Sequence, residues 1–334
     1  MPEFLKHPVE PFEVNSEKTI DRILDDMGKI SFQGRNLARA FAVWQNMLKK
    51  NAFIFFGLAG AMVPAGMRRI IVYLIENRMI DCIVSTGANL FHDICETVGY
   101  KHYLGSSNAD DMELLEHGID RIYDTFAREK EFMAADKVIF ELSKKLSRKK
   151  SYTTREYLNF IGKELGKTSK NAGIVSTAAK VGIPIYCPAI ADSSIGIALA
   201  ALEKKKDAFL KFDVVGDVRE TAEIVILNDV TGVIYISGGT PKNFIQQTEV
   251  TAPMIKRIRK GHTYAIQITT DSPHWGGLSG CTFEEAQSWG KISKNALMAT
   301  VNCDSTIALP LLVSGLAARF GNKMKKRPLK KYPF

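Results

Sequence analysis

The sequence predicts an α/β protein with a doubly wound, mostly parallel sheet and a long helical insertion. Two observations predict it: short apolar runs recur along the chain, and each is followed by a stretch with helical character. Near-continuous apolarity indicates strands buried on both faces, and their alternation with helices is typical of parallel crossover connections. The predicted strands lie at 52–57, 80–86, 183–188, 232–238 and 264–269.

The region from Asn108 to Lys150, between the second and third predicted strands, is long and highly charged. Its apolar residues recur at nearly helical spacing, so we expect a helical insertion that packs on the edge of the sheet. Asn108 is the expected N-cap, because acidic residues fill the following turn, where the helix dipole favours them. The apolar positions are Met112, Leu115, Ile119, Ile122 and Phe126.

The domain organisation is predicted to be simple. The 334 residues are 46% hydrophobic and 24% charged, which is the balance of a folded globular protein. Neither an internal repeat nor a low-complexity linker divides the chain. We therefore predict an amino-terminal arm over residues 1–30, a single domain over residues 31–320 and a basic carboxyl-terminal tail over residues 321–334.

The charge and the cysteines exclude several classes of protein. Much of the net charge of +9 comes from clusters at 144–150, 204–206 and 323–331, which are typical of solvated helix ends and loose termini. No aromatic interleaving or helix-turn-helix pattern supports a nucleic-acid partner. Five separated cysteines without a CxxC pair indicate neither disulfides nor a metal site, and they suit a reducing cytoplasm. The longest uncharged run, 52–67, is too short to span a bilayer, so we expect no membrane association.

The ends of the predicted strands are candidates for cofactor binding. Four of them are rich in glycine or hydroxyl groups, at 57–61, 85–89, 237–241 and 269–272. Glycines at carboxyl ends of parallel strands let the backbone approach phosphates, but none of these segments has the G-x-G-x-x-G spacing. A nucleotide-like cofactor and ordinary tight turns therefore remain alternatives. Asp304 either holds a ribose hydroxyl or caps the apolar helix that follows it.

Lys291 lies two residues after Trp289 and six residues after Glu285. A lysine amine becomes nucleophilic enough for Schiff-base chemistry when burial against an apolar wall lowers its pKa. From the local sequence alone, however, a lysine after Gly290 is better explained as a cation that complements the dipole at a helix end.

Several motifs in family order change that interpretation. Residues 285–292, E-A-Q-S-W-G-K-I, resemble the E-A-x-S-W-G-K-I motif of the deoxyhypusine synthases, which contains their catalytic lysine. Residues 238–242 resemble the family's G-G-x-x-K strand end, and residues 188–196 its P-A-x-x-D-x-S-x-G segment. Residues 213–219 and 304–312 follow in the same order, so the resemblance covers roughly residues 30–320.

The resemblance implies a Rossmann-like catalytic domain that binds NAD and transfers an alkyl group other than methyl. In the family, NAD takes a hydride from the secondary-amine carbon of spermidine, and the lysine captures the resulting imine with loss of a diamine. The aminobutyl group then passes to an acceptor amine and is reduced. Lys291 is accordingly implied as the nucleophile, in a homotetramer with active sites between subunits. By position, the NAD contacts of the family fall on Gly60, Ala61, Thr86, Gly87, Ala88, Asp192, Gly238, Thr270, Asp271, Asp304 and Ser305.

The polyamine pocket departs from the eukaryotic pattern of the family. Asn243 replaces a histidine, and the loop W-G-G-L-S-G at 275–280 lacks both acids of D-G-S-D-S-G. Ile197 replaces an aspartate, and Phe91 and His92 replace paired glutamates. The candidate substrate-binding residues are His92, Asn243, Glu285 and Trp289. Candidates to replace the lost polar groups, each with a purely structural role as the alternative, are His92, Asp93, Asp271 and His274.

A retained nucleophile in an altered pocket predicts unchanged chemistry with a changed donor or acceptor. The acceptor is either a lysine of the hypusine-bearing translation factor, or a free diamine such as putrescine, which would give homospermidine. Because these acids are missing, the alternative hypothesis is a catalytically silent relative that binds NAD or serves as a scaffold. The intact motif around Lys291 argues against silence.

Overall fold

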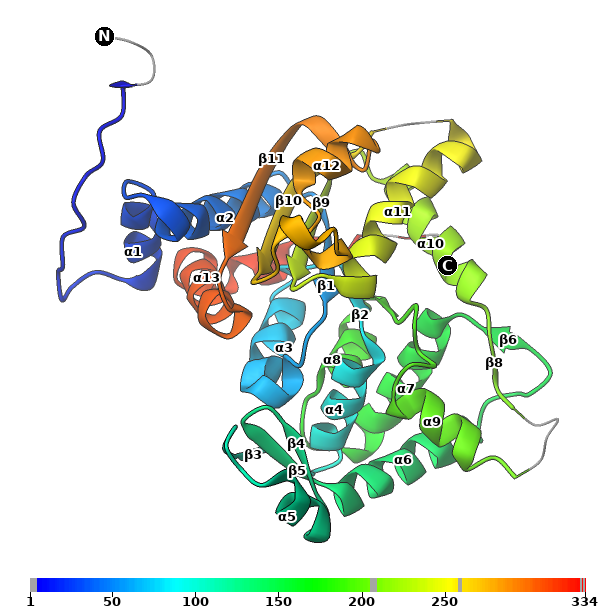
Figure 1. Ribbon diagram of the computed structural model, residues 1–334. Coiled ribbons are helices and arrows are strands. Elements are labelled where there is room, and N and C mark those ends of the chain that lie inside the picture. The colour runs from blue at the N-terminus through cyan, green and yellow to red at the C-terminus, as the bar shows by residue number, and fades with distance from the viewer. Residues whose placement is uncertain (1–4, 205–208, 258–259, 331, 333) are drawn as a thin grey trace.

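The computed structural model describes residues 5–204, 209–257, 260–330, 332 and 334, so Lys205, Lys206 and Lys331 of the basic clusters lie outside the described residues. A six-stranded sheet in the order β11-β10-β9-β1-β2-β7 forms its centre, and every pairing in that sheet is parallel (Figure 1). This confirms the predicted α/β fold. The strands are β1 (Phe53–Leu58), β2 (Cys82–Ser85), β7 (Ile185–Tyr186), β9 (Thr231–Ile236), β10 (His262–Thr269) and β11 (Ile292–Asn302).

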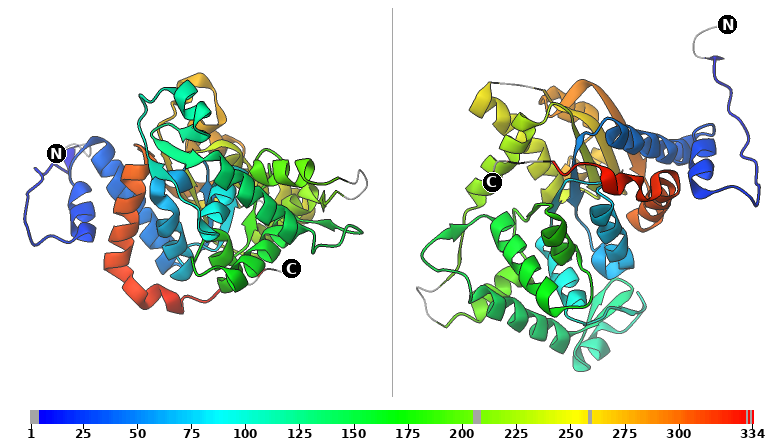
Figure 2. Two further views of the ribbon diagram at one scale, coloured as in Figure 1. Left: turned by 90° about the horizontal axis from the view of Figure 1, so that it is seen from below. Right: turned by 180° about the vertical axis from the view of Figure 1, so that it is seen from behind.

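Helices cover both faces of the sheet, which explains why the central strands are apolar throughout (Figures 1 and 2). In β1, Phe53 and Phe55 pack in one layer of the core, while Ile54 and Phe56 pack in the other. On the first side lie α10 (Val214–Leu227), α11 (Gly239–Lys256) and α12 (Phe283–Ser288). On the second side lie α2 (Phe32–Lys49), α3 (Arg68–Glu76), α4 (Gly87–Thr97), α8 (Ile174–Val181) and α13 (Ser305–Phe320).

The insertion is only partly helical. The helix expected to continue to Phe126 ends at Glu116, and residues 119–128 form an antiparallel hairpin that joins β3 in a small three-stranded sheet. Gly118 ends the helix with a φ of 63°, and Tyr123 turns the hairpin with a φ of 56°. The elements of the insertion are β3 (Tyr103–Leu104), α5 (Asp111–Glu116), β4 (Ile119–Ile122), β5 (Thr125–Arg128) and α6 (Glu129–Ser143).

The predicted cap of the insertion is also wrong. Asp110, and not Asn108, is the N-cap of α5, because its carboxylate accepts hydrogen bonds from the backbone N–H groups of Met112 (2.8 Å) and Glu113 (3.3 Å). Asn108 instead donates its backbone N–H to Ser106 Oγ at 3.1 Å.

Helix α1 (Ile20–Met27) and part of the basic carboxyl-terminal tail contact the body of the protein. Helix α1 packs on α13, where Arg319 forms ion pairs with Asp21 (3.0 Å) and Asp25 (2.7 Å). The basic tail is not solvated throughout, because Arg327 is 5% exposed and forms an ion pair with Asp81 at 2.6 Å. The domain boundaries near residues 30 and 320 stay predictions.

The remaining elements connect these layers. They are η2 (Val63–Met67), β6 (Ser151–Tyr152), α7 (Thr154–Thr168), α9 (Ser194–Ala201), β8 (Lys211–Phe212), η3 (Pro273–Trp275), η4 (Leu278–Gly280) and η5 (Gly321–Lys326). Within the described ranges, no helix combines the length and the apolarity needed to cross a membrane.

The contact between α7 and α8 predicts opposite effects for one substitution at two glycines of α7. A Cβ at Gly162 would collide with the carbonyl oxygen of Val175 and lie 2.7 Å from Ala179 Cβ, whereas one at Gly166 would meet no atom within 4 Å. We expect Gly162→Ala to lower the free energy of unfolding by about 1–3 kcal/mol through overpacking. The matched Gly166→Ala should raise it by about 0.5–1 kcal/mol. Urea denaturation of both variants checks this, and equal shifts would contradict the close packing.

Candidate functional site

The predicted cofactor residues lie along the carboxyl edge of the central sheet. Strand order reverses between β1 and β9, and ligands of open parallel sheets bind at such a switch point. Across the edge lie Asp304 and Ser305 after β11, Thr270 and Asp271 after β10, Gly238 after β9, Gly60 and Ala61 after β1, Thr86, Gly87 and Ala88 after β2, and Asp192 after β7.

Asn89 ties the ends of β1 and β2 together at this edge. Its Nδ2 donates to the Gly60 carbonyl (2.7 Å) and to Thr86 Oγ1 (3.0 Å), and its Oδ1 accepts from the Val63 N–H (3.1 Å). Gly60 has a φ of 70°, a conformation that glycine adopts without strain. Asn89 ends the predicted segment 85–89 but had no assigned role, although a polar residue in the first turn of an apolar helix was a usable signal.

The backbone at the end of β9 lies too close to a neighbouring loop to carry a side chain. A Cβ at Gly238 would lie 2.6 Å from Ser279 Cα, so only glycine fits beneath the loop that carries Ser279. That serine accepts the backbone N–H of Gly239 at Oγ (2.9 Å). The loop that has lost the acids of the family pattern is therefore packed directly on the switch point.

Asp304 caps α13, which was one of its two predicted roles. Its Oδ1 accepts from the backbone N–H of Thr306 at 2.7 Å and from the Thr306 hydroxyl at 2.5 Å. Both bonds use one carboxylate oxygen, and the residue is exposed.

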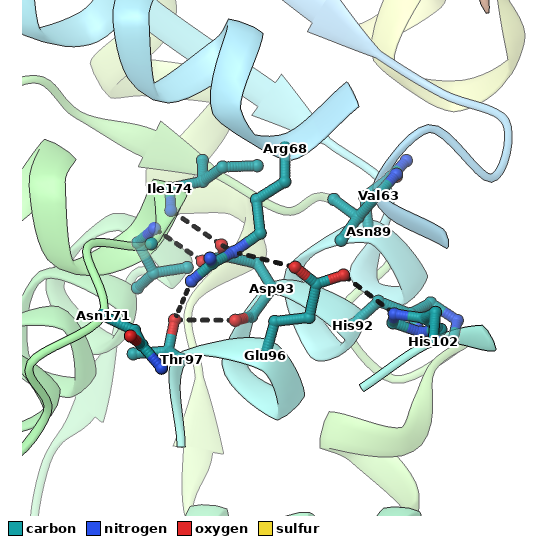
Figure 3. A network of polar contacts seen from close by, with 12 residues as sticks. Val63, Arg68, Asn89, His92, Asp93, Glu96, Thr97, His102, Asn171 and Ile174 are labelled. Carbon is teal, nitrogen blue, oxygen red and sulfur yellow. Dashed lines mark hydrogen bonds and ion pairs between the residues drawn. The ribbon is translucent and has the colours of Figure 1, made fainter. Parts of the chain in front are cut away.

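Asp93 holds three helices together and is committed to the fold (Figure 3). Its carboxylate accepts hydrogen bonds from Arg68 Nε (2.7 Å) of α3 and from the backbone N–H groups of Ile174 (2.7 Å) and Val175 (2.9 Å) at the start of α8. Arg68 also donates to Thr97 Oγ1 at 2.7 Å. Because this fully buried carboxylate is saturated by the fold, Asp93 has the structural role and does not replace a lost substrate contact.

His92 belongs to the outer part of the same network (Figure 3). Its Nδ1 lies 3.0 Å from His102 Nε2, and His102 Nδ1 lies 2.8 Å from Glu96 Oε1. Burial, with a smaller effect from His102, lowers the pKa of His92 to about 4. His92 is therefore neutral near pH 7 and carries no charge at a position where the family pattern has a glutamate.

Lys291 occupies a tight turn between α12 and β11. Its backbone N–H donates to the Ala286 carbonyl (3.1 Å), and its carbonyl accepts from the His262 N–H (3.0 Å). Its Nζ lies 5.1 Å from the centre of the Trp289 ring. The turn is made possible by Gly290, with a φ of 71°. Lys291 thus leads directly into an edge strand, β11, that the sequence analysis did not predict.

Lys242 is an additional buried lysine of the site. Its Nζ donates to Gln267 Oε1 (2.9 Å), to the Cys281 carbonyl (2.6 Å) and, more weakly, to the Ser279 carbonyl (3.4 Å). It is fully buried, and this burial lowers its pKa to about 8. The sequence placed Lys242 in a motif without a role and missed Gln267, whose signal was an amide within an apolar strand.

The surroundings of Lys242 link the cofactor edge to the Lys291 turn. After burial itself, the groups that act on the Lys242 amine include the charges of Glu285, Asp271 and Lys291. The charges of two carboxylates and of Lys291 therefore act on the buried Lys242 amine, which lies next to the segment that leads into α12. Such an arrangement can hold an ammonium group near an amine nucleophile.

Other predicted residues are not brought together. A cavity of about 340 Å³ between α2, α12, β10 and β11 is lined by Arg39, Asp271 and Glu284, but neither Lys291 nor His92 lines it. Trp289 is 60% exposed, and His274 is exposed with its ring bonded to Ser272 Oγ at 2.6 Å. Glu285 is exposed on α12, and Asn243 is half-buried near the start of α11.

Comparison with known proteins adds independent findings. A family model described as deoxyhypusine synthase matches residues 22–316. "Probable deoxyhypusine synthase 2" of Archaeoglobus fulgidus is 53% identical over 304 residues, which cover 91% of this chain and 99% of the relative. "Probable deoxyhypusine synthase 1" of the same organism is 38% identical over 309 residues, covering 92% and 97%. A solved structure described as a candidate deoxyhypusine synthase from Entamoeba histolytica matches with a TM-score of 0.64 at 19% identity, covering 92% and 96%, and it shows the fold.

The low pKa of His92 predicts a pH-dependent loss of stability. Because the pKa in the folded protein, about 4, is below the ordinary value of 6.5, the stabilisation is complete above pH 6.5 and is lost as the pH falls from 6.5 towards 4. Between pH 7 and pH 5, wild type should lose up to about 2 kcal/mol more unfolding free energy than His92→Gln. Urea denaturation at both pH values measures this. His117→Gln, at an exposed histidine, should behave as wild type, and an unchanged pH dependence in His92→Gln would contradict the assignment.

Proposed function

Because the chain belongs to the deoxyhypusine synthase family, we propose that it is an NAD-dependent aminobutyl transferase in which Lys291 is the covalent nucleophile. Family membership supports transfer of an aminobutyl group in general. The cofactor, the nucleophile and the identities of donor and acceptor form the proposal. The observation that carries it is the Lys291 turn, which presents an amine beside an indole ring within the full family motif.

The proposed chemistry uses the Lys291 nitrogen twice. Its neutral amine adds to the carbon of the substrate imine, and the bond from that carbon to the departing diamine breaks. The diamine leaves with the proton released from the Lys291 nitrogen. The acceptor amine then adds to the same carbon and displaces Lys291. The indole of Trp289 forms one wall beside the amine, and limiting the access of water protects the imine from hydrolysis.

The carboxyl edge of the sheet fits a dinucleotide. Gly60 has the positive φ that allows close backbone approach, Gly238 lies at the switch point, and the first turn of α4 after Thr86 begins at the same edge. When bound, NAD would supply the hydride acceptor that generates the imine and the hydride donor that completes the transfer. The residues that would hold it are the eleven predicted positions along this edge.

Charges near Lys242 support an amine substrate. Glu285 and Asp271 supply negative charge close to the two lysines, so they are suited to binding an ammonium group. Elsewhere the pocket differs from the family pattern: His92 is neutral, Phe91 is buried, and Ile197 is 58% exposed. We propose that these differences change the donor or the acceptor and leave the lysine chemistry unchanged.

The acceptor is either a protein lysine, as in deoxyhypusine formation, or a free diamine, as in homospermidine formation. Archaeoglobus fulgidus has two relatives of this chain, and the chain is more similar to the one numbered 2, at 53%, than to the one numbered 1, at 38%. Two related proteins in one organism favour divided roles. We further propose a cytoplasmic homotetramer, in which a neighbouring subunit completes each site between the cofactor edge and the Lys291 turn.

The covalent role of Lys291 predicts an adduct that can be trapped. Protein incubated with NAD and spermidine and then reduced with borohydride should gain one aminobutyl group on Lys291, as located by peptide mass spectrometry. Lys291→Arg should abolish the adduct, because the guanidinium is not nucleophilic at neutral pH. The matched control is Lys294→Arg, at an exposed lysine three residues further along, which should retain the adduct.

The same reaction separates the alternatives for function. Adding putrescine should release homospermidine and deplete the adduct if the acceptor is a free diamine. Adding the translation factor should instead label a lysine of that protein. A protein that binds NAD without forming an adduct with any polyamine would be a silent relative, and the proposal would be wrong.

A further inference from the structure

A line of buried polar side chains runs beneath α12 and the Lys291 turn. Lys242, Gln246 and Glu249 are spaced along one face of α11, and each is at most 1% exposed. Tyr235 of β9 and His262 of β10 face them from the sheet and are both fully buried. We name these five residues the polar seam. Helical faces that pack on a sheet are ordinarily apolar, so a polar stripe at this position needs a physical reason.

The polar seam is incompletely hydrogen-bonded. Five of its side-chain atoms are buried and have no partner among the described residues: Tyr235 Oη, Gln246 Oε1, Gln246 Nε2, Glu249 Oε1 and His262 Nε2. The Tyr235 hydroxyl lies close to the Gln246 side chain, but the two do not reach hydrogen-bonding geometry. Each unpartnered buried group destabilises the fold, so the polar seam is poorly explained as a device for stability.

Glu249 is connected to Lys291 through two backbone hydrogen bonds. Its Oε2 accepts the N–H of Gly261 at 3.0 Å, and the next residue, His262, donates its N–H to the Lys291 carbonyl at 3.0 Å. A Cβ at Gly261 would lie 2.5 Å from the Ser293 nitrogen, so the start of β10 is pressed against the start of β11. A shift of Gly261 must therefore move the turn that carries Lys291.

The His262 ring is fixed on the same side of the sheet. Its Nδ1 lies 2.9 Å from Thr231 Oγ1 and 3.7 Å from Glu249 Oε1. Burial lowers the pKa of His262 to about 4, so the ring is neutral near pH 7. The backbone of His262 and its side chain are thus both held, while the carboxyl group of Glu249 beside them titrates near neutral pH.

Glu249 changes protonation in the neutral range. Burial raises its pKa to about 7, and the Gly261 N–H and the charge of Lys260 oppose that rise. Tyr235 and His262 face it from the sheet, while Lys242 lies at the other end of the polar seam with Cys281 beside it. An ionised carboxylate accepts the Gly261 hydrogen bond more strongly than the neutral acid does.

We propose that Glu249 is a positioning residue that fixes the Lys291 turn through Gly261 and His262, more tightly when its carboxyl group is ionised. The inference rests on the proposed role of Lys291 as nucleophile. Glu249 touches no substrate and acts only through the backbone. Burial in the polar seam makes ionisation of the Glu249 carboxyl group unfavourable. The group therefore titrates near pH 7, and the geometry of the turn responds to pH in that range.

The test measures the reactivity of Lys291 without any substrate. Brief acetylation with acetic anhydride between pH 6 and 8, followed by peptide mass spectrometry, gives the labelling rate of Lys291 relative to the exposed Lys294 on β11. In wild type this ratio should change several-fold with a midpoint near pH 7, the pKa of Glu249. A ratio that is constant from pH 6 to 8 in wild type would overturn the proposal without any variant.

Glu249→Gln is the informative variant because it keeps the shape and an oxygen acceptor but does not titrate. Its labelling ratio should be independent of pH and close to the wild-type value at pH 6. The control is Glu223→Gln, the same change on α10 at a carboxylate that pairs with Arg219 at 2.9 Å, and it should retain the wild-type profile. A purely structural role of Glu249 would shift the melting temperature and leave the pH profile of the ratio unchanged.

Borohydride trapping with spermidine and NAD distinguishes this inference from the proposed function. If wild type forms no adduct, the proposed function fails, while the labelling ratio still decides whether Glu249 positions the turn. If the adduct forms, its rate should follow the labelling ratio with pH in wild type and lose that dependence in Glu249→Gln. An adduct rate with the same pH profile in both proteins would exclude the positioning role.

Discussion

The parallel pairing of β1 with both of its neighbours is the constraint on which the rest of the structure depends. Phe55 pairs with Cys82 of β2 on one side and with Val233 of β9 on the other. The chain therefore leaves β1 towards one side of the sheet and later returns to β9 on the other. That reversal opens the switch point, and the parallel direction gathers all strand ends at the same edge.

The same constraint explains which parts of the fold could be predicted. The four inner strands β10, β9, β1 and β2 are buried on both faces, so each appears in the sequence as an apolar run, and all four were predicted, together with the short edge strand β7. Strand β11 lies at the edge of the sheet, and its exposed Lys294 and Asn295 interrupt the apolar pattern. In the insertion, Ile119 and Ile122 have helical spacing, but both lie in β4, where every residue is half-buried and no face is marked by the pattern. Tyr123 turns the hairpin with a positive φ, a backbone conformation that a tyrosine in the sequence does not indicate.

The placement of the candidate site residues could be predicted where the motif is local in sequence. The Lys291 motif and the glycines at the strand ends lie in short segments, and those segments do end at the carboxyl edge or at the Lys291 turn. Contacts between distant segments could not be predicted. Asp93 meets the N–H of Ile174 across 81 positions, and Lys242 meets Gln267 across 25. The tertiary fold determines such pairs, because a buried polar group must be hydrogen-bonded and its partner comes from whichever distant segment packs beside it.

Two buried polar networks of this protein differ in a way that separates structural from functional burial. In the network around Asp93, the carboxylate accepts from Arg68 and from two backbone N–H groups, so both of its oxygens are hydrogen-bonded. In the polar seam, Glu249 has one oxygen bonded and one without a described partner. If a buried polar network served stability alone, apolar side chains of similar volume could replace it with little loss of unfolding free energy. Burial raises the pKa of Glu249 to about 7, and a titratable group is useful beneath a turn that presents an amine.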